Sequence, residues 1–116
     1  MDKVSDVKQE RAKKFAVRIV RLCKYLTDKK EFVISNQLLR SGISVGANLA
    51  EAEFAQSKDD FIHKISISLK EANETKYWLE LLYETEQLQP EQYTSISTDC
   101  SELISILISV LKTLKT

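Results

Sequence analysis

The segment from Gln37 to Ala52, QLLRSGISVGANLAEA, constrains the fold more than any other part of the chain. It has helical periodicity but carries two glycines and a polar stripe where a solvated face would be expected. The apolar stripe consists of Ile34, Leu38, Val45, Leu49 and Ala52. The polar stripe consists of Gln37, Arg40, Ser44, Asn48 and Glu51. Because such a helix has little surface suited to water, we expect it to be buried on more than one side.

Small residues occupy much of the remaining surface of this helix, where Gly42, Gly46 and Ala50 form one row. An interior glycine costs about 1 kcal/mol of helix stability relative to alanine, so an offsetting gain is expected. The interpretation we favour is close helix–helix approach across Gly42, Gly46 and Ala50. A kink at Gly42 is the alternative.

Length and composition favour one all-α domain over residues 1–116. A chain of 116 residues can bury a single core, and two glycines with one proline are too few for the turns of a β-sandwich or barrel. Apolar periodicity predicts helices over about 6–26, 35–55, 58–87 and 90–114. Ser35 and Ser57 are the expected caps of the second and third helices, and Pro90 suits the first turn of the fourth.

Each predicted helix carries an apolar seam, and the fourth carries more apolar surface than one seam requires. The third helix is expected to pack through Phe61, Ile65, Leu69, Ala72, Leu79 and Leu82. The fourth is expected to pack through Ile96, Cys100, Leu103, Leu107, Val110 and Leu114, with Ile104, Ile106, Ile108 and Leu111 outside that seam. This surplus predicts a second contact and hence oligomerisation.

Charge is balanced overall but divided along the chain. Residues 1–30 hold ten Lys and Arg against four Asp and Glu, whereas the remaining 86 residues hold seven against thirteen. We expect the basic first helix to pack near the acidic third helix. Arg11, Lys14, Arg18 and Arg21 recur on one face of the first helix. This face is either a nucleic-acid contact or a surface that is solvated or salt-linked to another subunit.

The sequence offers no signal for a membrane span, a signal peptide, a cofactor or a catalytic centre. The apolar runs are short, so we expect a cytoplasmic protein with no membrane association. Cys23 and Cys100 are isolated and are expected to be small buried hydrophobes. Asp60 and His63 form one Glu-x-x-His-like pair, but His63 is the only histidine, so no di-metal centre is predicted within a subunit. No catalytic or metal-binding residue is assigned.

The residues from Ile34 to Leu82 also carry a specific resemblance. The pattern Q-x-x-R-(small)-x-x-S-(I/V)-x-x-N-(I/L)-A-E-(G/A) is met by Gln37, Arg40, Ser41, Ser44, Val45, Asn48, Leu49, Ala50, Glu51 and Ala52. This pattern resembles the four-helix bundle family first described from intervening sequences in bacterial large-subunit ribosomal RNA genes, which includes the accessory protein of diversity-generating retroelements. Ala52 stands where many members have glycine. The resemblance implies an antiparallel up-down-up-down bundle that forms a ring-like homopentamer, and it implies no catalysis.

Two interpretations of the polar stripe remain open. It could be a ligand or nucleic-acid site, or it could be a structural network in which Arg40 and Glu51 pair with each other and with Asn48, within the bundle or across a subunit boundary. We favour the structural interpretation. The sequence therefore predicts a non-enzymatic, oligomeric interaction or scaffold protein that could bind a partner protein; the alternative is an RNA- or DNA-binding accessory protein that acts through the basic face.

Overall fold

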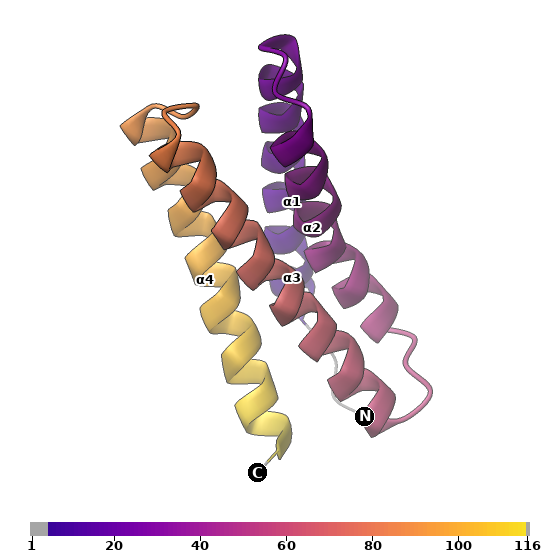
Figure 1. Cartoon of the computed structure of the whole chain (residues 1–116). Coiled ribbons are helices and arrows are strands. Elements are labelled where there is room, and N and C mark those ends of the chain that lie inside the picture. Colours follow the sequence, from indigo (N-terminus) through magenta and orange to yellow (C-terminus); the bar gives the residue numbers. More distant parts are fainter. Residues whose placement is uncertain (1–4, 116) are drawn as a thin grey trace.

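The computed structural model describes residues 5–115 of the chain, in which four helices account for nearly all residues (Figure 1). They are α1 (Asp6–Asp28), α2 (Val33–Ala52), α3 (Lys58–Glu84) and α4 (Pro90–Lys115). No strand occurs within the described range. The all-α prediction is confirmed, and the predicted helix ends differ from the observed ends by three residues at most. Asp2 and Lys3, which we counted in the basic segment, and both ends of the predicted 1–116 domain lie outside the described residues.

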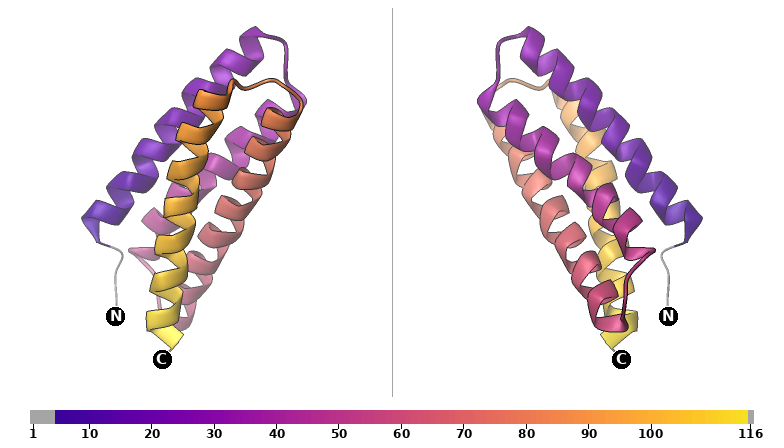
Figure 2. Two further views of the ribbon diagram at one scale, coloured as in Figure 1. Left: turned by 90° about the vertical axis from the view of Figure 1, so that its left-hand side faces the viewer. Right: turned by 90° about the vertical axis from the view of Figure 1, so that its right-hand side faces the viewer.

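Successive helices run in opposite directions, so the chain goes up, down, up and down (Figure 2). The connections α1–α2 and α3–α4 lie at one end of the bundle, and the α2–α3 connection lies at the other (Figure 2). Each helix packs on its two neighbours around the bundle, and the α1–α4 seam has the least contact of the four. The acidic α3 is therefore diagonal to the basic α1, and our expectation that these two helices pack together is wrong.

The core contains buried apolar side chains from all four helices, including Phe15, Leu38, Phe61 and Leu107. The buried residues of α3 follow an unbroken 4-3-4-3-4-3 spacing: Phe61, Ile65, Ser68, Ala72, Thr75, Leu79 and Leu82. Two of these positions are polar, and Leu69, which we expected in the seam, is only partly buried. Small polar residues thus occupy the middle of the seam where α3 packs on α2.

The helix starts show which side chains satisfy the free amides of each first turn. Ser57 accepts from the amide of Asp60 at 3.0 Å, as predicted for the start of α3. The prediction for Ser35 is wrong, because α2 begins at Val33 and Glu31 accepts from the amide of Ile34 at 2.8 Å. Ser35 is instead buried, with its hydroxyl 3.3 Å from the carbonyl oxygen of Cys23 on α1. A residue read as a cap is thus a contact between two helices.

Near the end of α4, the buried position lies one residue later in the sequence than predicted. Leu111 is buried where we expected Val110, which is only partly buried. Ile104 and Ile106 are partly buried and Ile108 is exposed, so the apolar surplus remains uncovered in a single chain. Pro90–Leu114 is long enough to cross a membrane and contains an 18-residue window with a mean hydropathy of 1.3. Core helices of water-soluble proteins meet the same criterion of length and composition.

Candidate functional site

The basic face of α1, formed by Arg11, Lys14, Arg18 and Arg21, lies on the side of α1 that faces α4. Arg11 pairs with Glu102 of α4. Arg18 pairs with Asp99 and also donates to the Ser95 hydroxyl at 2.9 Å. Two of the four bases are therefore balanced by acids of the same chain. Their partners come from α4 rather than from the α3 helix that we expected.

The two remaining bases border shallow hollows along the α1–α4 seam. Lys14 lines a hollow of about 150 Å³ with Phe15 and Leu103. Arg21 lines a larger hollow of about 350 Å³ near the end of α1 and the start of α4. Within the described part of the chain, neither Lys14 nor Arg21 makes a hydrogen bond or ion pair through its side chain. The uncommitted positive charge of this face is thus Lys14 and Arg21.

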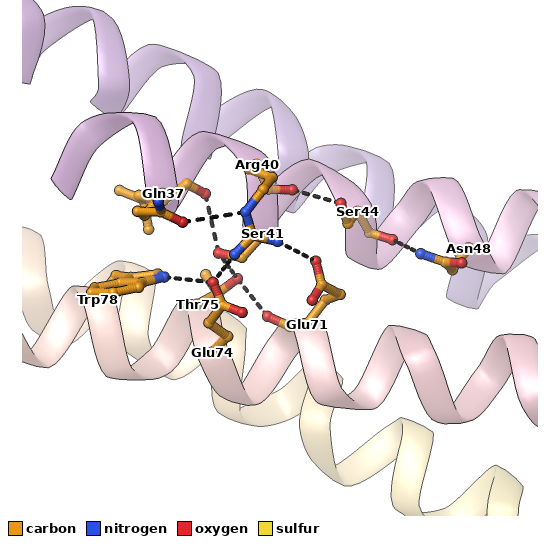
Figure 3. Close-up of polar contacts among 10 residues, drawn as sticks. Gln37, Arg40, Ser41, Ser44, Asn48, Glu71, Glu74, Thr75 and Trp78 are labelled. Atoms are coloured by element: carbon orange, nitrogen blue, oxygen red, sulfur yellow. Dashed lines mark hydrogen bonds and ion pairs between the residues drawn. The ribbon is translucent and has the colours of Figure 1, made fainter. Parts of the chain in front are cut away.

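The polar stripe of α2 faces α3 at the surface of the bundle (Figure 3). Arg40 is held by three side chains: it donates to Gln37 at 3.3 Å and to Glu71 at 3.0 Å, and it pairs with Glu74. The indole of Trp78 donates to the same Glu74 carboxylate at 2.9 Å. Within one chain Arg40 and Glu51 do not pair, because they lie eleven positions apart along α2 and each finds its partner on α3. A pair across a subunit boundary stays a prediction.

The other members of the stripe make local or exposed contacts. Ser44 donates to the carbonyl oxygen of Arg40, and Asn48 donates to that of Ser44 (Figure 3). Glu51 lies 2.8 Å from the ammonium of Lys64, and this contact raises the pKa of Lys64 through its hydrogen bond and its charge. Gln37, Arg40 and Glu51 are exposed in the single chain. The stripe is therefore the outer rim of the α2–α3 seam, and in a single chain it is not the buried network that we described.

The row of small residues divides into a tight position and two looser ones. A Cβ added at Gly42 would lie 2.7 Å from Cγ2 of the buried Ile19, so α1 and α2 approach too closely there for any side chain. At Gly46 the nearest atoms belong to Ala12 and lie 3.6 Å away, which is ordinary contact. Ala50 is exposed. The helices approach too closely for a Cβ at Gly42 only. Gly46 is in ordinary contact with Ala12 on one side and, with Ala50, borders an open surface on the other.

That open surface is the α1–α2 face, which we define as the outer side of the α1–α2 seam. It consists of Lys13, Ala16, Val17 and Val20 of α1 with Leu39, Ile43, Gly46, Ala47 and Ala50 of α2. A groove of about 500 Å³ runs over Ala16, Ile43 and Gly46, and polar side chains line its α1 side: Asp6, Gln9, Glu10 and Lys13. Val17, Val20 and Ile43 are 42%, 42% and 41% exposed. Such a concentration of apolar side chains on one side of a small bundle is typical of an interaction surface.

The described residues show no constellation for catalysis or metal binding. Cys23 and Cys100 are buried and unpaired, and burial raises the pKa of Cys23 and raises that of Cys100 to about 12. Both thiols therefore stay protonated near neutral pH. His63 is exposed, and no three His, Cys, Asp or Glu side chains within the described range could hold a metal ion.

Sequence reasoning missed the hydroxyl contacts inside the α2–α3 seam. Thr75 donates to the carbonyl oxygen of Glu71 at 2.8 Å and lies 2.9 Å from the Ser41 hydroxyl (Figure 3). Ser68 donates to the carbonyl oxygen of Val45 at 2.8 Å. The signal was present, because Ser68 and Thr75 continue the heptad spacing of the apolar residues around them. A search for apolar residues alone does not identify buried serine and threonine residues at these positions.

Comparison with known proteins is consistent with this architecture. A sequence model described as 23S rRNA-intervening sequence protein matches residues 6–109. A crystal structure of a protein of unknown function from the S23 ribosomal protein family of Bacteroides thetaiotaomicron superposes with a TM-score of 0.89 at 57% identity. The match covers 90% of this chain and 98% of that chain. No functionally curated protein matches the chain.

Proposed function

The chain belongs to the 23S rRNA-intervening sequence protein family, and we propose that it acts as a non-enzymatic, self-assembling scaffold in the cytoplasm. The observation that carries this proposal is the α1–α2 face, whose apolar side chains have no cover in a single chain. The sequence model shows the family, and the similar crystal structure from Bacteroides thetaiotaomicron is that of a protein of unknown function.

A second apolar surface supports assembly through two different sides of the molecule. Ile104 and Ile108, one turn apart on α4 and outside its core seam, lie on a helix that does not touch α2. Ile106 lies on the other side of that helix. A contact between the α1–α2 face of one copy and the α4 surface of the next would be head-to-tail. Such contacts generate rings when the rotation closes. A homopentamer, the state implied by the family resemblance, is the closed ring that we propose.

Light scattering of charge-insertion variants tests the assembly. We expect the wild-type chain at micromolar concentration to have a mass near five times 13.3 kDa. Ala47→Glu buries a charge in the proposed contact and should shift the mass toward 13.3 kDa with helical circular dichroism retained. Asn73→Glu adds the same charge at an exposed position of α3 and serves as the matched control. A wild-type chain that is monomeric overturns the proposal.

Mixing two monomeric variants separates a head-to-tail contact from a symmetric one. Ala47→Glu leaves the α4 surface intact, whereas Ile108→Glu leaves the α1–α2 face intact. A head-to-tail contact predicts that an equimolar mixture forms a dimer with twice the mass of 13.3 kDa, although each variant alone is monomeric. A mixture that stays monomeric contradicts the head-to-tail arrangement.

Weak nucleic-acid binding through the basic face is the second candidate function. The observation that favours it is the pair of uncommitted bases, Lys14 and Arg21, on the same side of α1. The ion pairs of Arg11 and Arg18 with α4 reduce the positive charge available to phosphates. We therefore expect binding to a mixed RNA pool only at low salt, because each phosphate contact releases counterions. A dissociation constant below about 1 μM at 150 mM salt, lost in Lys14→Glu/Arg21→Glu, would favour this candidate over the scaffold.

A further inference from the structure

The larger hollow of the α1–α4 seam has the size and lining of a small-molecule site. It is open to solvent and has a volume of about 350 Å³ between Arg18, Arg21, Leu22 and Tyr25 of α1 and Gln92 and Ile96 of α4. Small ligands occupy pockets of about 300–1,000 Å³. The hollow lies on the side of α1 that borders α4, and its lining residues belong neither to the α1–α2 face nor to the α4 isoleucines of the proposed contact.

The floor of this hollow is apolar. Ile96 is buried, Leu22 is partly buried, and the ring of Tyr25 forms one wall. The ammonium of Lys29 lies 4.9 Å from the centre of the Tyr25 ring and 3.2 Å from its hydroxyl oxygen. These two contacts restrain the ring. A ligand body that displaces water from this floor gains apolar burial.

The rim of the hollow offers hydrogen-bond donors. The Gln92 side-chain oxygen accepts from the amide of Gln89 at 2.9 Å, which leaves the Gln92 amide nitrogen to donate. The Tyr25 hydroxyl already accepts from Lys29, so its own proton is available. The Arg21 guanidinium has no partner within the described residues, whereas the charge of Arg18 is balanced by Asp99. The Lys29 ammonium, 3.2 Å from the Tyr25 hydroxyl oxygen, is a second cation at this rim without an ion pair among the described residues. An apolar floor under a rim of donors and cations suits an anion with an apolar body.

We propose that the α1–α4 hollow binds a small organic monocarboxylate with an aromatic or branched apolar body. Arg21 would pair with the carboxylate through its planar fork, a geometry that guanidinium groups provide and ammonium groups do not. Gln92 would donate to the same carboxylate.

Titration of the isotope-labelled full chain with benzoate tests this proposal by amide chemical-shift changes in NMR spectra. We expect saturable shifts centred on Arg21, Leu22, Tyr25 and Gln92, with a dissociation constant on the order of 1 mM for so small a ligand. Benzyl alcohol keeps the ring and lacks the charge, and it should bind at least tenfold more weakly. Arg21→Gln should abolish saturable benzoate binding, whereas Lys14→Gln, the same charge change one hollow away, should leave it unchanged.

Three results would overturn the proposal. The first is the absence of saturable shifts, and the second is equal loss of binding in Arg21→Gln and Lys14→Gln, which indicates only a diffuse positive surface. The third is phenyl phosphate binding at least tenfold more tightly than benzoate, which identifies a phosphate site and supports the nucleic-acid candidate. Because these variants lie outside the α1–α2 face, a failed titration leaves the scaffold proposal intact.

Discussion

The side of α2 that faces α3 is closed by polar contacts, whereas the side that flanks α1 ends in an open apolar surface. Toward α3, the buried Ser41 meets Thr75, and Arg40 covers the rim with Glu71 and Glu74. On the side of α2 that flanks α1, Ile43 and Ala47 are exposed. The difference shows that one helix motif serves two purposes. Its hydroxyl and guanidinium groups join α2 to α3, and its small residues past Gly42 form a surface for another molecule.

Alanine substitutions at Gly42 and Gly46 distinguish the packing of α2 on α1 from the open surface of α2. We expect the larger change in the free energy of unfolding at Gly42. The Cβ of Gly42→Ala would lie 2.7 Å from Ile19, a stiff β-branched side chain that is fully buried. We expect a loss of about 1–3 kcal/mol in the free energy of unfolding by urea. Gly46→Ala, with 3.6 Å to Ala12, has room and should gain up to about 1 kcal/mol of helix stability. If both variants change stability equally, close approach is not specific to Gly42.

Thr75 tests the polar closure of the α2–α3 seam. Thr75→Val keeps the shape of the buried side chain and removes its hydrogen bond to the carbonyl oxygen of Glu71 and its contact with Ser41. We expect a loss of about 1–2 kcal/mol in chemical denaturation. Thr98→Val removes a similar hydroxyl bond on the exposed side of α4 and should change stability by no more than about 0.5 kcal/mol. Equal effects at the two positions would argue against a role for buried hydroxyls.

Arg40 tests the rim of the same seam. Its side chain is 48% exposed, so the two ion pairs are screened by solvent. We expect Arg40→Met to cost about 1 kcal/mol, because it leaves Glu71 and Glu74 adjacent without a cation. Replacing Glu74 with Gln in the same chain should recover part of this loss. A loss of about 3–5 kcal/mol, typical of breaking a buried pair, would show that the stripe is covered in the assembled protein.

The residues that the sequence predicted well are those whose partners lie on the same helix or in the heptad pattern. Apolar spacing located all four helices and most of the core, and Ser57 was identified as a cap from the acidic turn that follows it. The partners of Arg40 and Arg18 could not be obtained in this way. Their partners lie 31–34 and 81 residues away, so pairing depends on which helices are adjacent in space. Local patterns carry no information on that adjacency.

The reactivity of Cys23 and Cys100 toward an alkylating reagent tests whether both side chains are buried. Burial raises the pKa of Cys100 to about 12 and also raises that of Cys23, which lowers the thiolate fraction of both at pH 8. Both cysteines are also buried. We expect the native chain to resist iodoacetamide at pH 8 over hours and to react at both cysteines once unfolded in guanidinium. Rapid native-state labelling would contradict the burial of these residues.

The accessibility of Ala47 in solution tests most directly whether the α1–α2 face is covered by another copy. Ala47→Cys places one reactive thiol on that face in a chain whose own cysteines are buried, and Asn73→Cys places one on the exposed side of α3 as a control. We predict that Ala47→Cys reacts with a maleimide at least tenfold more slowly than Asn73→Cys at micromolar concentration. Dilution to nanomolar concentration should narrow this difference as the assembly dissociates. Equal labelling rates at micromolar concentration would contradict the account.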